Sequence, residues 1–397
     1  MKIKMAISIF ICFVISSFAQ VPDQFQRLIE HGEYTTAQKL MRMELATNQQ
    51  LTPKMRQDIS FEIERLNRIK KDFTRSREYI VDYIQQYIPN VSDEDLANWE
   101  AEKSLEYKII DGEKQYFKWA GPNLFRINKK AKKIKQEINN KKQQPADPFD
   151  LDAHVSEIVT DFEKQKKSIL QPRRFRVTYT PTVTENVVPD GALLRCSLPY
   201  PRAVENRQTD INLISTEPER YLIADNEDYL QRSIYLEKVV IADQKAKFQV
   251  VFEYTGHSVF HPIDPEQVTV PKITDALKPF VSERPPHIIF SPKLKLLSQQ
   301  IVGNEKNPYR IAQKIFKWID DNIPWASARE YSTFYNVSDY VYENRHADCG
   351  MQTIFFMTLC RMNGIPTRWQ SGWVTEPGEE GMHDWGEIYF EPYGWVP

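Results

Sequence analysis

The sequence predicts an α+β protein with a helical N-terminal part, a central antiparallel β-sandwich and a mixed C-terminal part. Apolar residues recur at helical spacing over residues 20–145, whereas apolar and polar residues alternate from Pro172 to about residue 260. Beyond residue 290, an amphipathic helix, an apolar helix and an aromatic-rich alternating segment follow one another. A chain of 397 residues is long enough for these parts to form separate domains.

Composition argues against several classes of function. Charged residues make up 27% of the chain and the formal net charge is −2, so no global basic field would attract nucleic acid. The sequence contains no phosphate-binding loop and no cofactor motif. We therefore expect neither a nucleic-acid partner nor a bound cofactor.

The first residues have the pattern of a signal peptide, which we assign to residues 1–19. Lys2 and Lys4 form a positive start, the apolar run Ala6 to Phe18 follows, and Ala19 offers a cleavage point. An uncleaved anchor is the alternative, but the run is shorter than the roughly 20 apolar residues of a spanning helix. No other segment is apolar enough to cross a bilayer. We expect an exported protein, periplasmic or extracellular.

Three cysteines remain after removal of the signal peptide: Cys196, Cys349 and Cys360. This small, odd number excludes a scaffold built on disulfides. If Cys349 and Cys360 lie on one helix, they are about 16 Å apart, which is too far for a bridge. At least one thiol should therefore be free.

Apolar stripes predict a helical domain over residues 20–145. One stripe covers residues 61–73, and Pro53 suits the start of its helix. A second stripe covers residues 79–88 and stops at Pro89. An ordinary helical bundle is the simplest interpretation of this part.

A linker or helix over residues 146–171 leads into a β-sandwich that we place at residues 172–290. Residues 174–179 and 248–254 alternate as strands do, and turn signals separate the short strands. His257 and His261 are four residues apart, a spacing that can bind metal. No acidic or cysteine partner stands at a matching spacing, so we interpret them as surface histidines and predict no metal site.

The C-terminal domain, residues 291–397, contains the candidate chemistry. A helix is predicted from Tyr309 to Trp318, and a second helix begins at Cys349 and ends near Gly364. The free N–H groups and the dipole at a helix N-terminus stabilise a thiolate, which is the nucleophilic form of cysteine. Cys349 is therefore the candidate nucleophile.

His383 begins an alternating, aromatic-rich segment that predicts a strand. A cysteine at a helix N-terminus and a histidine on a nearby strand form the ion pair of many cysteine hydrolases and acyltransferases. The histidine takes the thiol proton and later returns it to the leaving amine. His383 is therefore the candidate base for Cys349.

A family resemblance rests on the order of these motifs. They are Asp348-Cys349-Gly350 before an apolar helix, Gly364-Ile365-Pro366-Thr367-Arg368, His383-Asp384-Trp385-Gly386-Glu387, and Gly394-Trp395-Val396-Pro397. As a set they resemble the core of the transglutaminase-like superfamily, over about residues 300–397. The resemblance implies a papain-like fold, in which a helix with the cysteine packs on an antiparallel sheet with the histidine.

The resemblance also implies a third catalytic residue, usually Asp, on the strand after the histidine strand. The sequence stops at Pro397, where that strand should begin, so we expect this residue past Pro397; a degenerate site is the alternative. Asp384 should point to the opposite face from His383, and Glu387 should lie about 13 Å along the strand. Glu387 could instead pair with Arg368.

Each candidate has alternatives. Cys349 could be a small buried hydrophobic residue, as we expect for Cys360, and His383 could be structural. His346 is a rival base, although it would have to fold back from the loop before Cys349. The oxyanion donors could include the Cys349 backbone N–H and a side chain of the loop Tyr331–Tyr335.

These patterns predict an exported, thiol-dependent enzyme that cleaves or transfers amide bonds. We favour a peptidase or amidase over a cross-linking transglutaminase, with a peptide, a protein or a peptidoglycan stem as substrate. An inactive scaffold that binds a partner through its helical and β domains is the second hypothesis. A metal-dependent hydrolase would need a ligand cluster that the sequence does not show.

Overall fold

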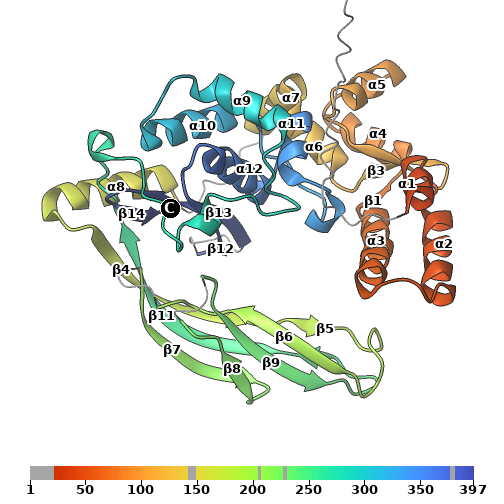
Figure 1. The fold of residues 1–397 in the computed structure, drawn as a ribbon, viewed down its shortest axis with the longest axis horizontal. Helices are drawn as coiled ribbons and strands as arrows, with labels where there is room; N and C mark the ends of the chain where they lie inside the picture. Colours follow the sequence, from red (N-terminus) through yellow and green to blue (C-terminus); the bar gives the residue numbers. More distant parts are fainter. Residues whose placement is uncertain (1–21, 142–148, 204–206, 227–229, 376–380) are drawn as a thin grey trace, which may run out of the picture. The chain divides into compact units, whose positions relative to one another are not determined.

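The computed structural model describes residues 22–141, 149–203, 207–226, 230–375 and 381–397. The predicted signal peptide, residues 1–19, lies outside them. Within the described ranges, no helix is both long enough and apolar enough to span a membrane. The chain divides into two compact units, and the mixture of helices with several antiparallel sheets confirms the α+β prediction (Figure 1).

The first unit takes its residues from Met1–Gln144, Ser282–Gly303 and Lys314–Met362. Its N-terminal helices are α1 (Asp23–Glu30), α2 (Tyr34–Thr47), α3 (Pro53–Asp72), α4 (Arg77–Gln85), α5 (Asp93–Ala101), α6 (Ala120–Ile127) and α7 (Lys129–Lys141). As predicted, α3 begins at Pro53, and the Thr52 hydroxyl caps it by accepting from the Met55 backbone N–H at 3.2 Å. Ile63, Leu66 and Ile69 are buried in this helix.

A small sheet within this helical part was not predicted. Its strands are β1 (Phe73–Arg75), β2 (Tyr107–Ile110) and β3 (Glu113–Phe117), in the order β1-β3-β2. Three to five residues are too few for an alternating pattern to stand out from helical stripes. The turn between β2 and β3 is Asp111-Gly112, with φ of 51° and 88°, which is the signal that could have revealed the hairpin.

The rest of the first unit includes α9 (Pro292–Val302), the 3₁₀ helix η3 (Tyr331–Thr333), α11 (Val337–Asn344) and α12 (Cys349–Met362). Met351, Phe355 and Leu359 of α12 are almost completely buried. The hydroxyls of Ser338 on α11 and Thr358 on α12 lie 2.7 Å apart, so a buried hydrogen bond joins the two helices. α12 is therefore a core element, and its first residue has a fixed position in this unit.

The second unit takes its residues from Pro145–Val281, Asn304–Gln313 and Asn363–Pro397. It begins with α8 (Leu151–Gln165). Two antiparallel sheets follow, in the orders β4 (Ile169–Tyr179), β11 (Gln249–Val259), β7 (Gln208–Glu217) and β6 (Leu193–Pro199), β9 (Ser233–Val239), β8 (Tyr221–Ile223). A minor pair joins β5 (Thr182–Val183) to β10 (Ala246–Lys247). Leu198, Ile234, Leu236 and Phe252 come from both sheets into one core, as a sandwich requires.

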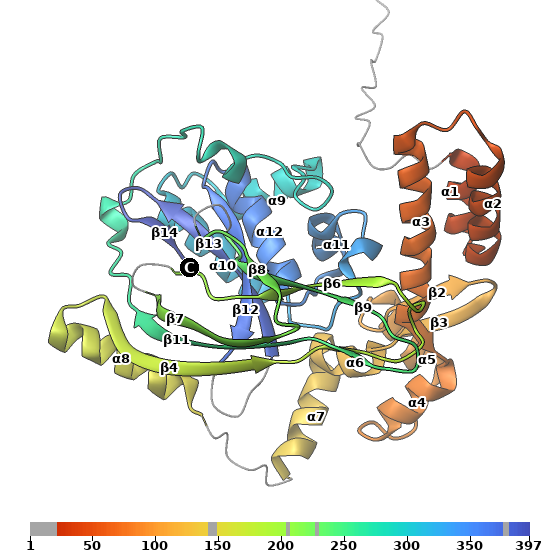
Figure 2. The same cartoon turned by 90° about the horizontal axis from the view of Figure 1, so that it is seen from below.

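The second unit also holds the sheet that bears His383. Its strands are β12 (Thr367–Val374), β13 (Gly381–Phe390) and β14 (Gly394–Val396), all antiparallel with β13 in the middle (Figure 2). Trp373 of β12 packs on the sandwich core, with its ring stacked 6.2 Å from that of Phe252. This apolar contact couples the sheet to the sandwich.

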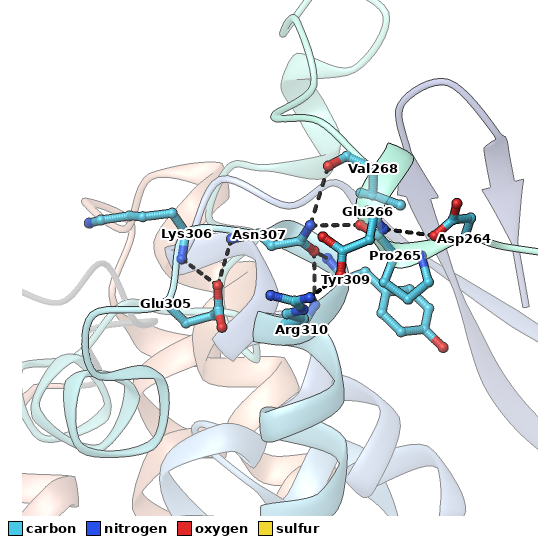
Figure 3. Close-up of polar contacts among 9 residues, drawn as sticks. All are labelled: Asp264, Pro265, Glu266, Val268, Glu305, Lys306, Asn307, Tyr309 and Arg310. Atoms are coloured by element: carbon cyan, nitrogen blue, oxygen red, sulfur yellow. Dashed lines mark hydrogen bonds and ion pairs between the residues drawn. The ribbon is translucent and has the colours of Figure 1, made fainter.

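The start of α10 (Pro308–Asn322) is tied to the 3₁₀ helix η1 (Pro265–Gln267) by the Asn307 side chain and by an ion pair (Figure 3). The Asn307 side-chain oxygen accepts from the backbone N–H groups of Tyr309 at 3.0 Å and Arg310 at 3.2 Å. Its Nδ2 donates to the Pro265 carbonyl at 2.8 Å. Arg310 also forms an ion pair with Glu266. Asn307 therefore caps the helix and holds η1 against it.

Candidate active site

Cys349 is the first residue of α12, as predicted, and its side chain is half-buried. The preceding residue, Asp348, caps the helix. Its Oδ1 accepts from the Met351 backbone N–H at 2.9 Å, and its carbonyl accepts from the Gln352 N–H at 2.9 Å. This cap fixes the direction of the helix start, where the macrodipole favours a negative sulfur.

A tyrosine hydroxyl also holds Asp348. Tyr331, in η3, donates to Asp348 Oδ1 at 2.6 Å. Burial raises the pKa of Asp348, and the hydrogen bonds from Tyr331 and from the backbone N–H of Met351 oppose that rise. Desolvation outweighs the donated hydrogen bonds, so the pKa of the carboxyl group beside Cys349 lies above its ordinary value.

The residues just before Cys349 are held by the segment that follows α10. The Ala326 N–H donates to the Ala347 carbonyl at 2.9 Å, and the Ala347 N–H donates to the Pro324 carbonyl at 3.2 Å. The Gln352 side chain donates to the Ile323 carbonyl at 2.9 Å. Backbone and side chain together fix both sides of the nucleophile position.

Helix α3 supports the loop that carries Tyr331. Arg65 is 4% exposed and bonds Glu62 through Nε at 2.7 Å. Its guanidinium also donates to the Tyr335 hydroxyl at 2.6 Å and to the Thr333 carbonyl at 3.3 Å. Asp72, at the end of α3, accepts from the Glu330 backbone N–H at 2.8 Å.

Helix α6 holds the start of the same loop. Asn123 exchanges two hydrogen bonds with the backbone of Ser327, at 2.8 and 2.9 Å. Arg126 donates to the Ser327 hydroxyl at 2.8 Å. We name residues 327–335 the buttressed loop. Sequence reasoning missed these contacts because the partners are more than 200 residues apart along the chain.

His346, the rival base, is 4% exposed. Its ring meets Tyr340 edge-on, with centroids 5.8 Å apart. Burial lowers the pKa of His346, while the nearby Glu106 raises it and Arg329 lowers it. Arg329 and Glu106 themselves form an ion pair of 3.1 Å. This enclosed polar environment argues against His346 as the base.

His383 lies on β13, directly opposite Gly372 of β12, and its side chain is exposed. A Cβ atom built on Gly372 would stand 2.9 Å from Cη2 of Trp385. The Trp385 ring therefore covers the strand residue opposite His383, and only glycine leaves room for it. Asp384 pairs with Ser371 in the ladder and belongs to the other face of the strand, as predicted.

Glu387 ties the strands of this sheet together. Arg368 Nε donates to Glu387 Oε2 at 2.5 Å, which confirms the predicted pair, and Gln370 donates to the same oxygen at 2.9 Å. The Arg368 guanidinium lies 4.2 Å from the centre of the Trp395 ring on β14. Glu387 is therefore a buried brace on the histidine strand itself.

The structure assigns different roles to the remaining candidates. Cys360 is completely buried, as predicted, and burial raises the pKa of its thiol. Cys196 and Cys360 are free thiols, which confirms the prediction of at least one. His257 Nε2 lies 3.2 Å from the Thr209 hydroxyl. No set of three His, Cys, Asp or Glu residues is placed to bind a metal in the part of the chain that the structure describes.

Cys349 belongs to the first unit and His383 to the second. The first unit fixes Cys349 through the cap and the buttressed loop, and the second unit fixes His383 through its sheet. Their pairing stays a prediction.

Comparison with known proteins gives one family match. Residues 295–397 match the model of the transglutaminase-like superfamily. No curated protein matches the chain.

Three solved structures show weak likeness. A candidate cysteine protease from Cytophaga hutchinsonii is 20% identical, with 57% of this chain and 76% of its own covered, at a TM-score of 0.46. The periplasmic domain of TgpA from Pseudomonas aeruginosa is 14% identical, with 59% and 88% covered, at 0.27. A candidate protease from Parabacteroides distasonis is 9% identical, with 57% and 64% covered, at 0.23. Scores this low have no bearing on function.

The family match covers the segment that contains the motifs described above. Both Cys349 and His383 fall inside it. The C-terminal part of this chain, residues 295–397, therefore matches the transglutaminase-like superfamily.

Proposed function

We propose that the protein is an exported enzyme that cleaves amide bonds in peptides, with Cys349 as nucleophile and His383 as base. The observation that supports this most is the position of Cys349, the first residue of a capped, buried helix inside the transglutaminase-like segment. A structural cysteine would gain nothing from this position, whereas a nucleophile gains a stabilised thiolate.

The reaction follows from these two groups. His383 takes the proton of the Cys349 thiol, and the sulfur attacks the amide carbonyl. The C–N bond then breaks, the amine leaves with the proton from His383, and a thioester remains on Cys349. Water, deprotonated by His383, breaks the thioester to give the acid and the free thiol. The Cys349 backbone N–H is a donor for the oxyanion.

The acyl acceptor decides between hydrolysis and cross-linking. Water as acceptor gives a peptidase or amidase, and a lysine amine gives a transglutaminase product from the same thioester. We favour water, with a peptide, protein or peptidoglycan stem as substrate. A product assay with and without added amine separates the two, because only transfer converts the amine to an amide.

The orienting residue for His383 is proposed to lie on a continuation of β14 past Pro397. In the observed register Tyr389 faces Trp395, so each step back along β13 is one step forward along β14. The second and fourth positions after Pro397 would then share the face of His383. An acidic or amide residue at either position would suit the role.

Export is part of the proposal. Cleavage after Ala19 would leave Gln20 as the first residue of the mature protein. Mass spectrometry of protein recovered from the periplasm or medium should show this terminus. An intact N-terminus on exported protein would favour the anchor instead.

The test of the enzyme is the pH dependence of Cys349 alkylation, followed by peptide mass mapping so that Cys196 and Cys360 are read separately. A free thiol titrates near pH 8.5, and a histidine-paired thiolate reacts several units lower. We expect alkylation of Cys349 at about pH 5 in the wild type and its loss in His383→Ala. If Cys349 titrates like a free thiol in both proteins, the enzyme proposal is wrong and the inactive binding scaffold is the remaining hypothesis.

A further inference from the structure

The second unit contains an open cleft that the proposed reaction does not use. Its volume is about 380 Å³, large enough for one or two side chains of a ligand. Residues of α8, β4, β7 and β11 form its walls, together with Val374 and Thr375 at the end of β12. The lining comes entirely from the second unit.

The cleft is basic. Arg173 and Arg207 line it, with His154 and His257, and no Asp or Glu is among the described residues that form its surface. Arg173 is exposed on β4, directly opposite Gly256 of β11. An arginine fork in a partly enclosed site suits a carboxylate, which it can bind with two parallel hydrogen bonds.

An aromatic floor lies beside these charges. The rings of Phe175 and Tyr254 stack with centroids 5.2 Å apart and planes 19° from parallel. A Cβ atom on Gly256 would stand 2.9 Å from Phe175, so the glycine lets this ring lie against the sheet. The cleft thus combines an apolar surface with two cationic groups, the combination that recognises an acidic group next to an apolar one.

The cleft adjoins the strands that carry His383. Val374 pairs with Gly381 in the ladder, and Gly372, two residues earlier, pairs with His383. Two residues of a strand span roughly 7 Å, so a peptide of a few residues could reach from His383 to the cleft. Arg207 lies 3.8 Å from Glu387, the brace of the same sheet.

We propose that this cleft binds a carboxylate of the peptide substrate, with Arg173 as its main cationic contact and Phe175 and Tyr254 under the neighbouring apolar side chain. The inference rests on the proposed function for the nature of the ligand. The carboxylate can belong to an acidic side chain or to a free C-terminus, and the experiment separates these sources.

The test measures binding by calorimetry in the Cys349→Ala variant, which lacks the nucleophile. Three peptides share the form acetyl-Ala-Phe-X-Phe-Ala: one with Glu at X and an amidated end, one with Gln and a free end, and one with Gln and an amidated end. We expect the Glu peptide or the free-end peptide to bind about tenfold more tightly than the neutral one. The preference should weaken between about 0.05 M and about 0.5 M salt.

A second arm introduces Arg173→Gln into the same background. We expect the charged and neutral peptides to bind equally in this variant. The control is Arg176→Gln on the same strand, because Arg176 pairs with Glu253 and does not line the cleft. It should keep the preference, and matching unfolding temperatures would show that both variants are folded.

Equal binding of all three peptides to the parent, or a preference that survives Arg173→Gln, would overturn the inference. Because Cys349→Ala removes the reaction itself, a carboxylate preference without any alkylation shift in the native protein would sink the enzyme proposal and keep the cleft. An alkylation shift in the native protein without any carboxylate preference would keep the enzyme proposal and overturn the inference about the cleft.

Discussion

At the scale of single residues, Asp348 sets the environment of the candidate nucleophile. It offers a cap to α12, yet its carboxylate adds a negative charge next to a sulfur that must become negative. The Tyr331 hydroxyl binds the same oxygen and draws off part of that charge. An uncharged residue with the same shape should keep the cap and remove the negative charge that disfavours a thiolate at Cys349.

Asp348→Asn is that change. Burial raises the pKa of Asp348, so its folded-state pKa lies above the unfolded value, and its favourable contribution is present at low pH and lost as pH rises through the folded pKa. We therefore expect the stability of the variant relative to wild type to increase as the pH rises through that range, in urea unfolding at several pH values. The alkylation profile of Cys349 should also move to lower pH. If the free energy of unfolding changes with pH in the same way in the variant and the wild type, this prediction is wrong.

Gly372→Ala tests the close approach of Trp385 to the histidine strand. The added methyl would lie 2.9 Å from the indole, so the ring or the strand must move. We expect a loss of about 1–3 kcal/mol of stability, measured by urea unfolding, and lower reactivity of Cys349. The control is Gly381→Ala on β13, where a Cβ meets nothing within 4 Å. Equal effects of the two changes would show that Trp385 is not the cause.

At the scale of elements, predictions from the sequence succeeded where a pattern was long or a punctuating residue was strong. Pro53 and Cys349 mark the starts of their helices, and Gly364, with φ of 71°, follows the end of α12. The Arg368–Glu387 pair was predictable because the two motifs lie on adjacent strands. β1 to β3 were missed because short strands do not show a period.

The Asn307 side chain links two elements, because its amide caps α10 and holds η1. Asn307→Ala should lower stability by about 1–2 kcal/mol, because it removes both functions. Asn307→Asp keeps the accepting oxygen but loses the donor to the Pro265 carbonyl, so its loss should be smaller. Guanidinium unfolding of the three proteins measures both. Identical losses in the two variants would mean that the cap contributes nothing.

At the scale of the whole molecule, the candidate site depends on residues far from it in sequence. Arg65, Asp72 and Asn123 hold the buttressed loop, whose Tyr331 binds Asp348 beside Cys349. Motif reasoning could propose Cys349 and His383 because they lie in one short segment. It could not find the contacts that hold the buttressed loop, because nothing in a local pattern connects partners from distant parts of the chain.

The contacts that α3 and α6 make with the buttressed loop predict that residues 291–397 alone will not form a well-ordered core. Without α3 and α6, the carbonyl of Thr333 and the backbone of Ser327 lose their hydrogen-bond partners and the packing around them, and each lost hydrogen bond removes about 0.5–1.5 kcal/mol. A small domain has a total stability of only about 5–15 kcal/mol, so several losses together should abolish cooperative unfolding.

The measurement compares that fragment with residues 20–397 by thermal circular dichroism and by dispersion of amide resonances. A matched variant of the longer protein, Tyr335→Phe, removes one hydroxyl that Arg65 binds and leaves the ring. We expect this variant to unfold cooperatively with a loss of about 1 kcal/mol. A cooperative transition in the fragment would show instead that the transglutaminase-like core is an independent domain, and that the helical N-terminal part supports neither the loop nor Cys349.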